Sequence, residues 1–207
     1  MPFLKITLTV FSMILASQTF ANTTSEKCIQ QFDDAEFVKA KISCQLAADN
    51  GDAASQTVLG EMYDLGDGVI ADQKMAAKWW NIAADKAYLP AQNLLAMKYF
   101  YGGDIFQQQP EWDQDYSKAF EIWKQSAFNS EVTSQFMLGE MYKNGQGVTT
   151  NYAESYAWFK IALEGGYKLA TDSLIELSRV ISADQKNTGL DRIVDLKKLI
   201  AETTKTN

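Results

Sequence analysis

Few residues of this 207-residue chain are of types that do chemistry, and their spacing fits no known catalytic pattern. The sequence contains no histidine, which excludes Ser-His-Asp and Cys-His nucleophiles and most transition-metal sites. No serine has a lysine three residues after it, so the S-x-x-K nucleophile pattern is absent. Neither a P-loop nor a dinucleotide fingerprint occurs. We therefore expect no catalytic residues, no metal site and no cofactor, and hence no enzyme.

The two cysteines, Cys28 and Cys44, are the chemically distinctive pair. Sixteen residues on one straight helix would separate them by about 24 Å, whereas a disulfide needs Cα atoms about 4.4–6.8 Å apart. A bond therefore requires a chain reversal, and the acidic pair Asp33-Asp34 could provide it by capping a helix that begins near Glu36. Such a bond could stabilise the fold by roughly 3 kcal/mol. The alternative is a redox-active pair, which usually has C-x-x-C spacing.

The first 21 residues have the pattern of a secretory signal peptide. Lys5 precedes an apolar run over 6–16, and small or polar residues lead to Ala21, after which we expect cleavage. The run is shorter than the roughly 20 residues that span a bilayer, although an uncleaved anchor or a buried helix remains the alternative. A periplasmic or secreted protein without stable membrane insertion is predicted, in an environment that permits disulfides.

The charge is acidic, with 26 acidic against 19 basic residues and a net charge of −7. Nucleic acid and anionic lipid surfaces are therefore poor electrostatic partners. The simplest interpretation of the acidic balance is solubility.

The chain contains an internal sequence repeat. The segment Leu59–Tyr63 returns 79 residues later as Leu138–Tyr142 in the same order, and the glycines and tryptophans that follow match as well. A third copy lies between them: Leu95 lies 36 residues after Leu59, and about seven extra residues fall within 102–113. A period near 36 is typical of a helical pair that buries its core only against neighbouring pairs.

Within each copy, apolar and small residues recur at helical spacing on both sides of a glycine-rich turn. The turns at Gly66 and Gly145 read as helix stops. Asp72 and Asn151 then suit the N-cap of the following helix. The tryptophans and tyrosines at repeat positions are expected to pack the units together.

This pattern, A-x-x-x-L-G-x-x-Y-x-x-G-x-G-V-x-x-D-x-x-x-A-x-x-W-x-x-x-A-A-x-x-G, resembles the Sel1-like repeat, a relative of the tetratricopeptide repeat. It fits the segments from Leu59 and from Leu138 closely, whereas the middle copy has Ala96 for the helical glycine and Ile122 for the tryptophan. The resemblance implies an all-α solenoid of stacked antiparallel helical hairpins in a right-handed superhelix. It also implies an adaptor for protein complexes.

The resulting organisation has four parts, one of which contains the three repeats. We predict a signal peptide over 1–21, an N-terminal capping hairpin with the disulfide over 22–53, three repeats over 54–89, 90–132 and 133–167, and C-terminal capping helices with a tail over 168–207.

Positions that break the repeat are the best candidates for binding. In the middle copy, Met97 replaces a glutamate and Phe100 replaces a charged residue, which indicates an exposed apolar patch. The candidate partner-binding residues, from this helix and the inserted loop, are Met97, Phe100, Tyr101, Phe106 and Trp112. The alternative is that the loop folds over the patch and hides it.

We therefore expect a non-enzymatic adaptor of the bacterial cell envelope that binds a protein on the concave face of its repeats. A binder of peptidoglycan or another cell-wall ligand, using the aromatic middle loop, is the main alternative. A β-lactam hydrolase is a remote one.

Overall fold

The computed structural model describes residues 24–102 and 113–206, and within these ranges the chain is helical and contains no strand. The predicted all-α fold is therefore confirmed. A helix over residues 24–33 comes first. It is followed by α2 (Phe37–Asp49), α3 (Ala53–Leu65), α4 (Gln73–Ala84), α5 (Leu89–Tyr101), α6 (Tyr116–Phe128), α7 (Val132–Asn144), α8 (Tyr152–Glu164), α9 (Ala170–Leu177) and α10 (Ala183–Thr206). The predicted signal peptide and most of the inserted loop lie outside the described residues.

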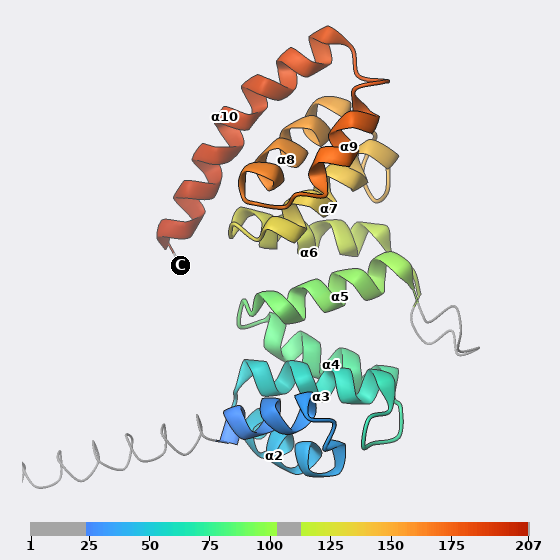
Figure 1. Ribbon diagram of the computed structural model, residues 1–207, viewed down its shortest axis with the longest axis vertical. Helices are drawn as coiled ribbons and strands as arrows, with labels where there is room; N and C mark the ends of the chain where they lie inside the picture. Colours follow the sequence, from blue (N-terminus) through green and yellow to red (C-terminus); the bar gives the residue numbers. More distant parts are fainter. Residues whose placement is uncertain (1–23, 103–112, 207) are drawn as a thin grey trace, which may run out of the picture. The chain divides into compact units, whose positions relative to one another are not determined.

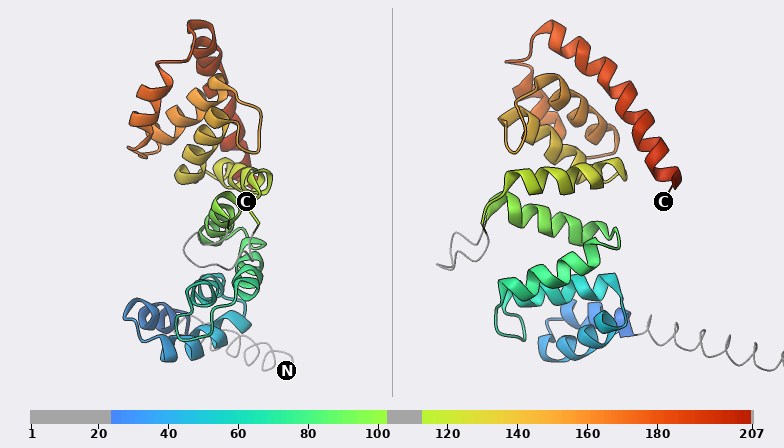
Figure 2. Two further views of the ribbon diagram at one scale, coloured as in Figure 1. Left: turned by 90° about the vertical axis from the view of Figure 1, so that its right-hand side faces the viewer. Right: turned by 180° about the vertical axis from the view of Figure 1, so that it is seen from behind.

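The helices form two compact units that divide between Ala91 and Gln92. In the first unit, α2 packs on α3 and α3 on α4 (Figure 1). In the second unit, α6, α7, α8 and α9 pack in sequence, and the long α10 runs beside α8 and α6 (Figure 2). Consecutive antiparallel hairpins of this kind make up an α-solenoid, as expected.

Polar caps and glycines set the helix ends at the predicted positions. The Asp72 carboxylate accepts hydrogen bonds from two backbone N–H groups at the start of α4, and the Asn151 amide oxygen does the same for α8. Gly66 and Gly145 end α3 and α7 in the left-handed conformation, with φ of 81° and 71°. Both sets of boundary predictions are confirmed.

One predicted cap is wrong. The N-cap of α2 is Glu36, whose side chain makes no capping hydrogen bond, and neither Asp33 nor Asp34 caps this helix. The chain reverses at Ala35, one residue before the N-cap Glu36, because Ala35 adopts a φ of 57°. Asp34 therefore belongs to the end of the preceding helix, where its carboxylate accepts a hydrogen bond from Gln30.

The disulfide joins Cys28 of the first helix to Cys44 of α2, with Cα atoms 4.6 Å apart. Both cysteines are fully buried and belong to the same apolar cluster as Leu59, Met62 and Trp79. The bond is thus part of the core of the first unit and holds the helix over 24–33 against α2.

Close contact between a small residue on the first helix of a repeat and an aromatic ring on the second fixes each hairpin. A Cβ added to Gly60 would lie 2.4 Å from the Trp80 ring, and one added to Gly139 would lie 2.4 Å from the Phe159 ring. In the middle repeat the matching residues, Ala96 and Trp123, are both buried in one cluster. The repeat aromatics are therefore core residues, as predicted.

Buried side chains and ion pairs hold α10 in place. Ile193, Leu196 and Ile200 join the core cluster that contains Trp123 and Trp158. Arg192 Nε lies 2.7 Å from Glu154 Oε1 of α8, and Lys197 pairs with Glu164 at the other end of that helix. Leu190 and Val194 of the same helix are 45% and 69% exposed.

The turns that follow the second helix of each hairpin all contain a residue with a positive φ, and this residue is a glycine in only some of them. Gly51 and Gly166 have positive φ values of 91° and 101°, and the matching Ala87 and Ser130 have values of 58° and 66°. A residue with a Cβ pays about 1–2 kcal/mol for this conformation. Ala87 and Ser130 are therefore strained positions.

Substituting Ala87→Gly should stabilise the protein by about 0.5–1 kcal/mol, because relief of this strain exceeds the extra freedom that glycine has when unfolded. Thermal unfolding measures the change. Gly166→Ala is the reverse control, since a Cβ there meets no atom within 4 Å and only backbone strain is added. A fall in melting temperature for Ala87→Gly would contradict the interpretation.

Candidate functional site

The described part of the candidate patch lies on α5. Among its five predicted residues, Met97 and Tyr101 are 47% and 62% exposed. Phe106 and Trp112 lie outside the described residues, so their relation to the patch stays a prediction. The structure brings Met97, Phe100 and Tyr101 together on the last two turns of one helix.

Phe100 differs from its neighbours because it is half-buried and packed. Its ring centroid lies 4.9 Å from that of Tyr101, 5.1 Å from that of Tyr116 and 5.4 Å from that of Trp123. Tilted and edge-on contacts at these distances are attractive. Phe100 therefore anchors α5 to α6 and supports the exposed Tyr101 ring from beneath.

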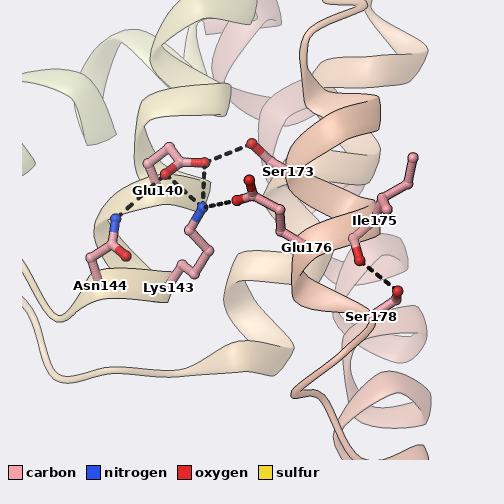
Figure 3. A network of polar contacts seen from close by, with 7 residues as sticks. All are labelled: Glu140, Lys143, Asn144, Ser173, Ile175, Glu176 and Ser178. Atoms are coloured by element: carbon pink, nitrogen blue, oxygen red, sulfur yellow. Dashed lines mark hydrogen bonds and ion pairs between the residues drawn. The ribbon is translucent and has the colours of Figure 1, made fainter.

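In the third repeat, Glu140 and Lys143 stand at the positions of Met97 and Phe100. Both form polar contacts within the protein (Figure 3). Glu140 accepts a hydrogen bond of 2.7 Å from Ser173 of α9 and pairs with Lys143 at 2.9 Å. Lys143 also lies 3.4 Å from Glu176 of α9. The helix face that is polar and paired in the third repeat is apolar in the middle one.

The first repeat has no lysine at the position of Lys143. Glu61 matches Glu140, but Asp64 stands in place of Lys143. Burial, followed by the negative charges of Asp64 and Asp33, raises the pKa of the Glu61 carboxyl above its usual value. This carboxylate therefore costs stability at neutral pH rather than adding to it.

Sequence reasoning missed a buried glutamine in the first helix of each repeat. Gln56 and Gln135 are 3% exposed and donate to the carbonyl oxygens of Ala48 and Ala127 at 2.9 and 3.2 Å. These carbonyls lie near the ends of α2 and α6, where helices leave acceptors without partners. The recurrence of glutamine at 56, 92 and 135 is a signal that could have predicted this link.

The described residues contain neither a metal-ligating cluster nor a membrane-spanning helix. No group of three or more metal-ligating side chains occurs among them. None of the helices in the described ranges combines the length and apolar character needed to cross a membrane.

Comparison with known proteins identifies the repeats. The Sel1 repeat model matches residues 53–88, 89–127 and 132–167, which together make up more than half of the chain. The chain belongs to the Sel1 repeat family. Proteins built from Sel1 repeats generally mediate protein–protein interactions and are typically non-enzymatic scaffolds.

Similar structures and relatives agree with this family. The crystal structure of c5321, a protective antigen of uropathogenic Escherichia coli strains with an SLR fold, matches with a TM-score of 0.71 and 22% identity over 91% of this chain and 39% of that one. A Sel1 repeat protein from Oxalobacter formigenes matches with a TM-score of 0.57 and 28% identity, over 68% of this chain and 38% of that one. The chitin synthase regulator SKT5 of Saccharomyces cerevisiae is 28% identical over 130 residues, which is 62% of this chain and 18% of the yeast protein. This Sel1 repeat chain thus spans well under half of each protein.

Replacing Glu61 with glutamine should stabilise the protein at neutral pH. The raised pKa means that the charged form destabilises the fold above that pKa, and that stability recovers as pH falls through it. The gain in melting temperature for Glu61→Gln should therefore be present at pH 7 and should shrink towards pH 4.

The matched control for this change is Glu140→Gln, which removes the ion pair with Lys143 and should lower the melting temperature at pH 7. Equal changes in melting temperature for Glu61→Gln and Glu140→Gln at pH 7 would contradict the prediction, because the lysine beside Glu140 would then have no effect on stability.

Phe100→Ala should lower the free energy of unfolding by about 2 kcal/mol, because it removes a half-buried ring from the contact between α5 and α6. Tyr101→Ala should cost less than about 1 kcal/mol, since most of that side chain is exposed. Denaturant titration measures both values. A negligible cost for Phe100→Ala would place its ring outside the core.

Proposed function

We propose that this Sel1 repeat protein is an adaptor of the bacterial cell envelope that binds a protein partner on the concave side expected of its repeats. Met97 and Tyr101 are the proposed contact residues, with Phe100 holding them in place. The observation that carries the proposal is their exposure at positions where the other repeats have a glutamate and a leucine or asparagine. Exposed apolar side chains of this kind tend to mark interaction surfaces.

The envelope location is supported by two independent features. The first 21 residues have the composition of a cleavable signal peptide, with cleavage expected after Ala21. The buried Cys28–Cys44 bond belongs to an oxidising compartment, because cytosolic proteins rarely keep structural disulfides. Periplasmic and secreted locations both satisfy these features.

A cell-wall ligand is the alternative, because the inserted loop adds the aromatic residues Phe106 and Trp112 next to α5 in the sequence. Aromatic rings contact sugars and peptides equally well. A β-lactam hydrolase ranks below both proposals, since the chain lacks the S-x-x-K nucleophile.

The test is quantitative cross-linking and capture from an envelope extract with the mature protein. The double variant Met97→Glu with Tyr101→Ser restores the charge found at Glu61 and Glu140 and removes the exposed ring. We expect it to capture the partner at least tenfold less than the natural chain, with a similar melting temperature.

The matched control is Leu65→Ser with Ile70→Glu, which changes two residues that are 62% and 91% exposed in the first repeat. Leu65 occupies the position of Tyr101 in that repeat. Equal loss of capture by both variants would contradict a specific role for α5. Retention by purified peptidoglycan sacculi with no captured protein would favour the cell-wall alternative, and turnover of a chromogenic cephalosporin would favour the hydrolase.

A further inference from the structure

A second candidate binding site lies in the last part of the chain, between α8, α9 and the start of α10. These segments line a cavity of about 370 Å³, within the usual size range of small-ligand pockets. It includes no residue of the α5 patch. The cavity is therefore separate in its residues from the proposed adaptor surface.

The floor of the cavity is apolar and fixed. Tyr156, Leu174 and Ile181 line it and pack against a buried cluster that includes Phe159 and Leu177. Ile175 adds an apolar side chain that is 52% exposed. The cavity therefore offers an apolar surface that is backed by buried core residues.

Its charged residues are two lysines and no carboxylate. Lys160 of α8 is half-buried and Lys186 of α10 is exposed, with its Nζ 5.9 Å from the centre of the Tyr156 ring. No ion pair forms at either lysine within the described residues. Two cations beside one apolar cavity, in a chain with a net charge of −7, mark a local site for an anion.

Three glutamates near the cavity pair with basic residues outside it, and Asp172 and Asp184, which adjoin cavity residues in the sequence, do not line the cavity. Glu164, one turn after Lys160, pairs with Lys197, and Glu154 pairs with Arg192. On α9, Glu176 points towards Lys143, whereas Ile175 and Ser178 lie on the other side of the helix (Figure 3). The ion pairs of these glutamates use Lys143, Arg192 and Lys197, and the cavity lining adds two lysines without a carboxylate.

We propose that this cavity binds the carboxyl terminus of a peptide whose last residue is apolar. The apolar floor and the two lysines line one cavity of about 370 Å³, so a ligand must carry an apolar group and a carboxylate within a few ångströms of each other. A terminal residue carries both on one Cα. Hydroxyl groups of Thr171, Ser178 and Ser182 at the same cavity can bond to the peptide backbone.

Fluorescence anisotropy with two labelled tetrapeptides, Gly-Gly-Ser-Leu with a free carboxylate and the same sequence with a terminal amide, tests this directly on the full mature chain. We expect the free acid to bind at least tenfold tighter than the amide, and its affinity to fall as salt is added. Equal binding of acid and amide, or no binding of either, would overturn the proposal.

The variant Lys160→Gln with Lys186→Gln should reduce binding of the free acid at least tenfold. Lys168→Gln with Lys198→Gln removes the same charge from exposed positions outside the cavity, and it should leave binding unchanged. Equal losses would show that only net charge matters and would overturn the site. Because the acid and amide comparison uses the natural chain, the test holds even where a variant folds poorly.

Ile175→Ser should weaken binding of the peptide that ends in leucine more than that of one that ends in glycine, since it removes part of the apolar lining. Competition by decanoate with the same affinity as the peptide would show that any amphipathic carboxylate fits, and would overturn the assignment to a peptide terminus.

Discussion

The contact between a ring on the second helix of a repeat and a small residue on the first is the constraint on which this structure depends. Trp80 covers Gly60 so closely that no Cβ fits between them, and Phe159 covers Gly139 in the same way. Because this contact brings the two helices of a hairpin together, it also places the repeat aromatics in the core. The most conspicuous rings in the sequence are therefore unavailable to a partner.

Binding capacity must then come from positions that the core does not fix. The faces of α5 and α7 illustrate this, since Glu140 and Lys143 are linked to α9 whereas Met97 is exposed. The repeat thus provides a common scaffold, and the residues that differ between copies provide an individual surface. Differences in charge also alter stability, because Glu61 lacks the lysine that Glu140 has.

Ion pairs also hold α10 against α8 in the last part of the chain. The pairs that fasten α10 use Glu154 and Glu164 of α8. Lysines at the adjacent cavity are left without carboxylates, and an apolar floor lies beside them. The last helices, which the sequence presents as a structural cap, thus carry the cavity for which we propose an anionic ligand.

The sequence by itself determined the repeats and the helix boundaries at Gly66, Asp72 and Asn151, because these depend on local spacing and backbone chemistry. It predicted the Cys28–Cys44 bond only on condition of a chain reversal between the two residues, which the structure contains. It missed the cap of α2, since the reversal at Ala35 uses a left-handed alanine that no local rule favours. Only the tertiary structure decided that Phe100 is packed while Tyr101 is exposed, and that Lys160 and Lys186 share a cavity. Such facts depend on which distant helices meet, and helical periodicity within one segment does not contain that information.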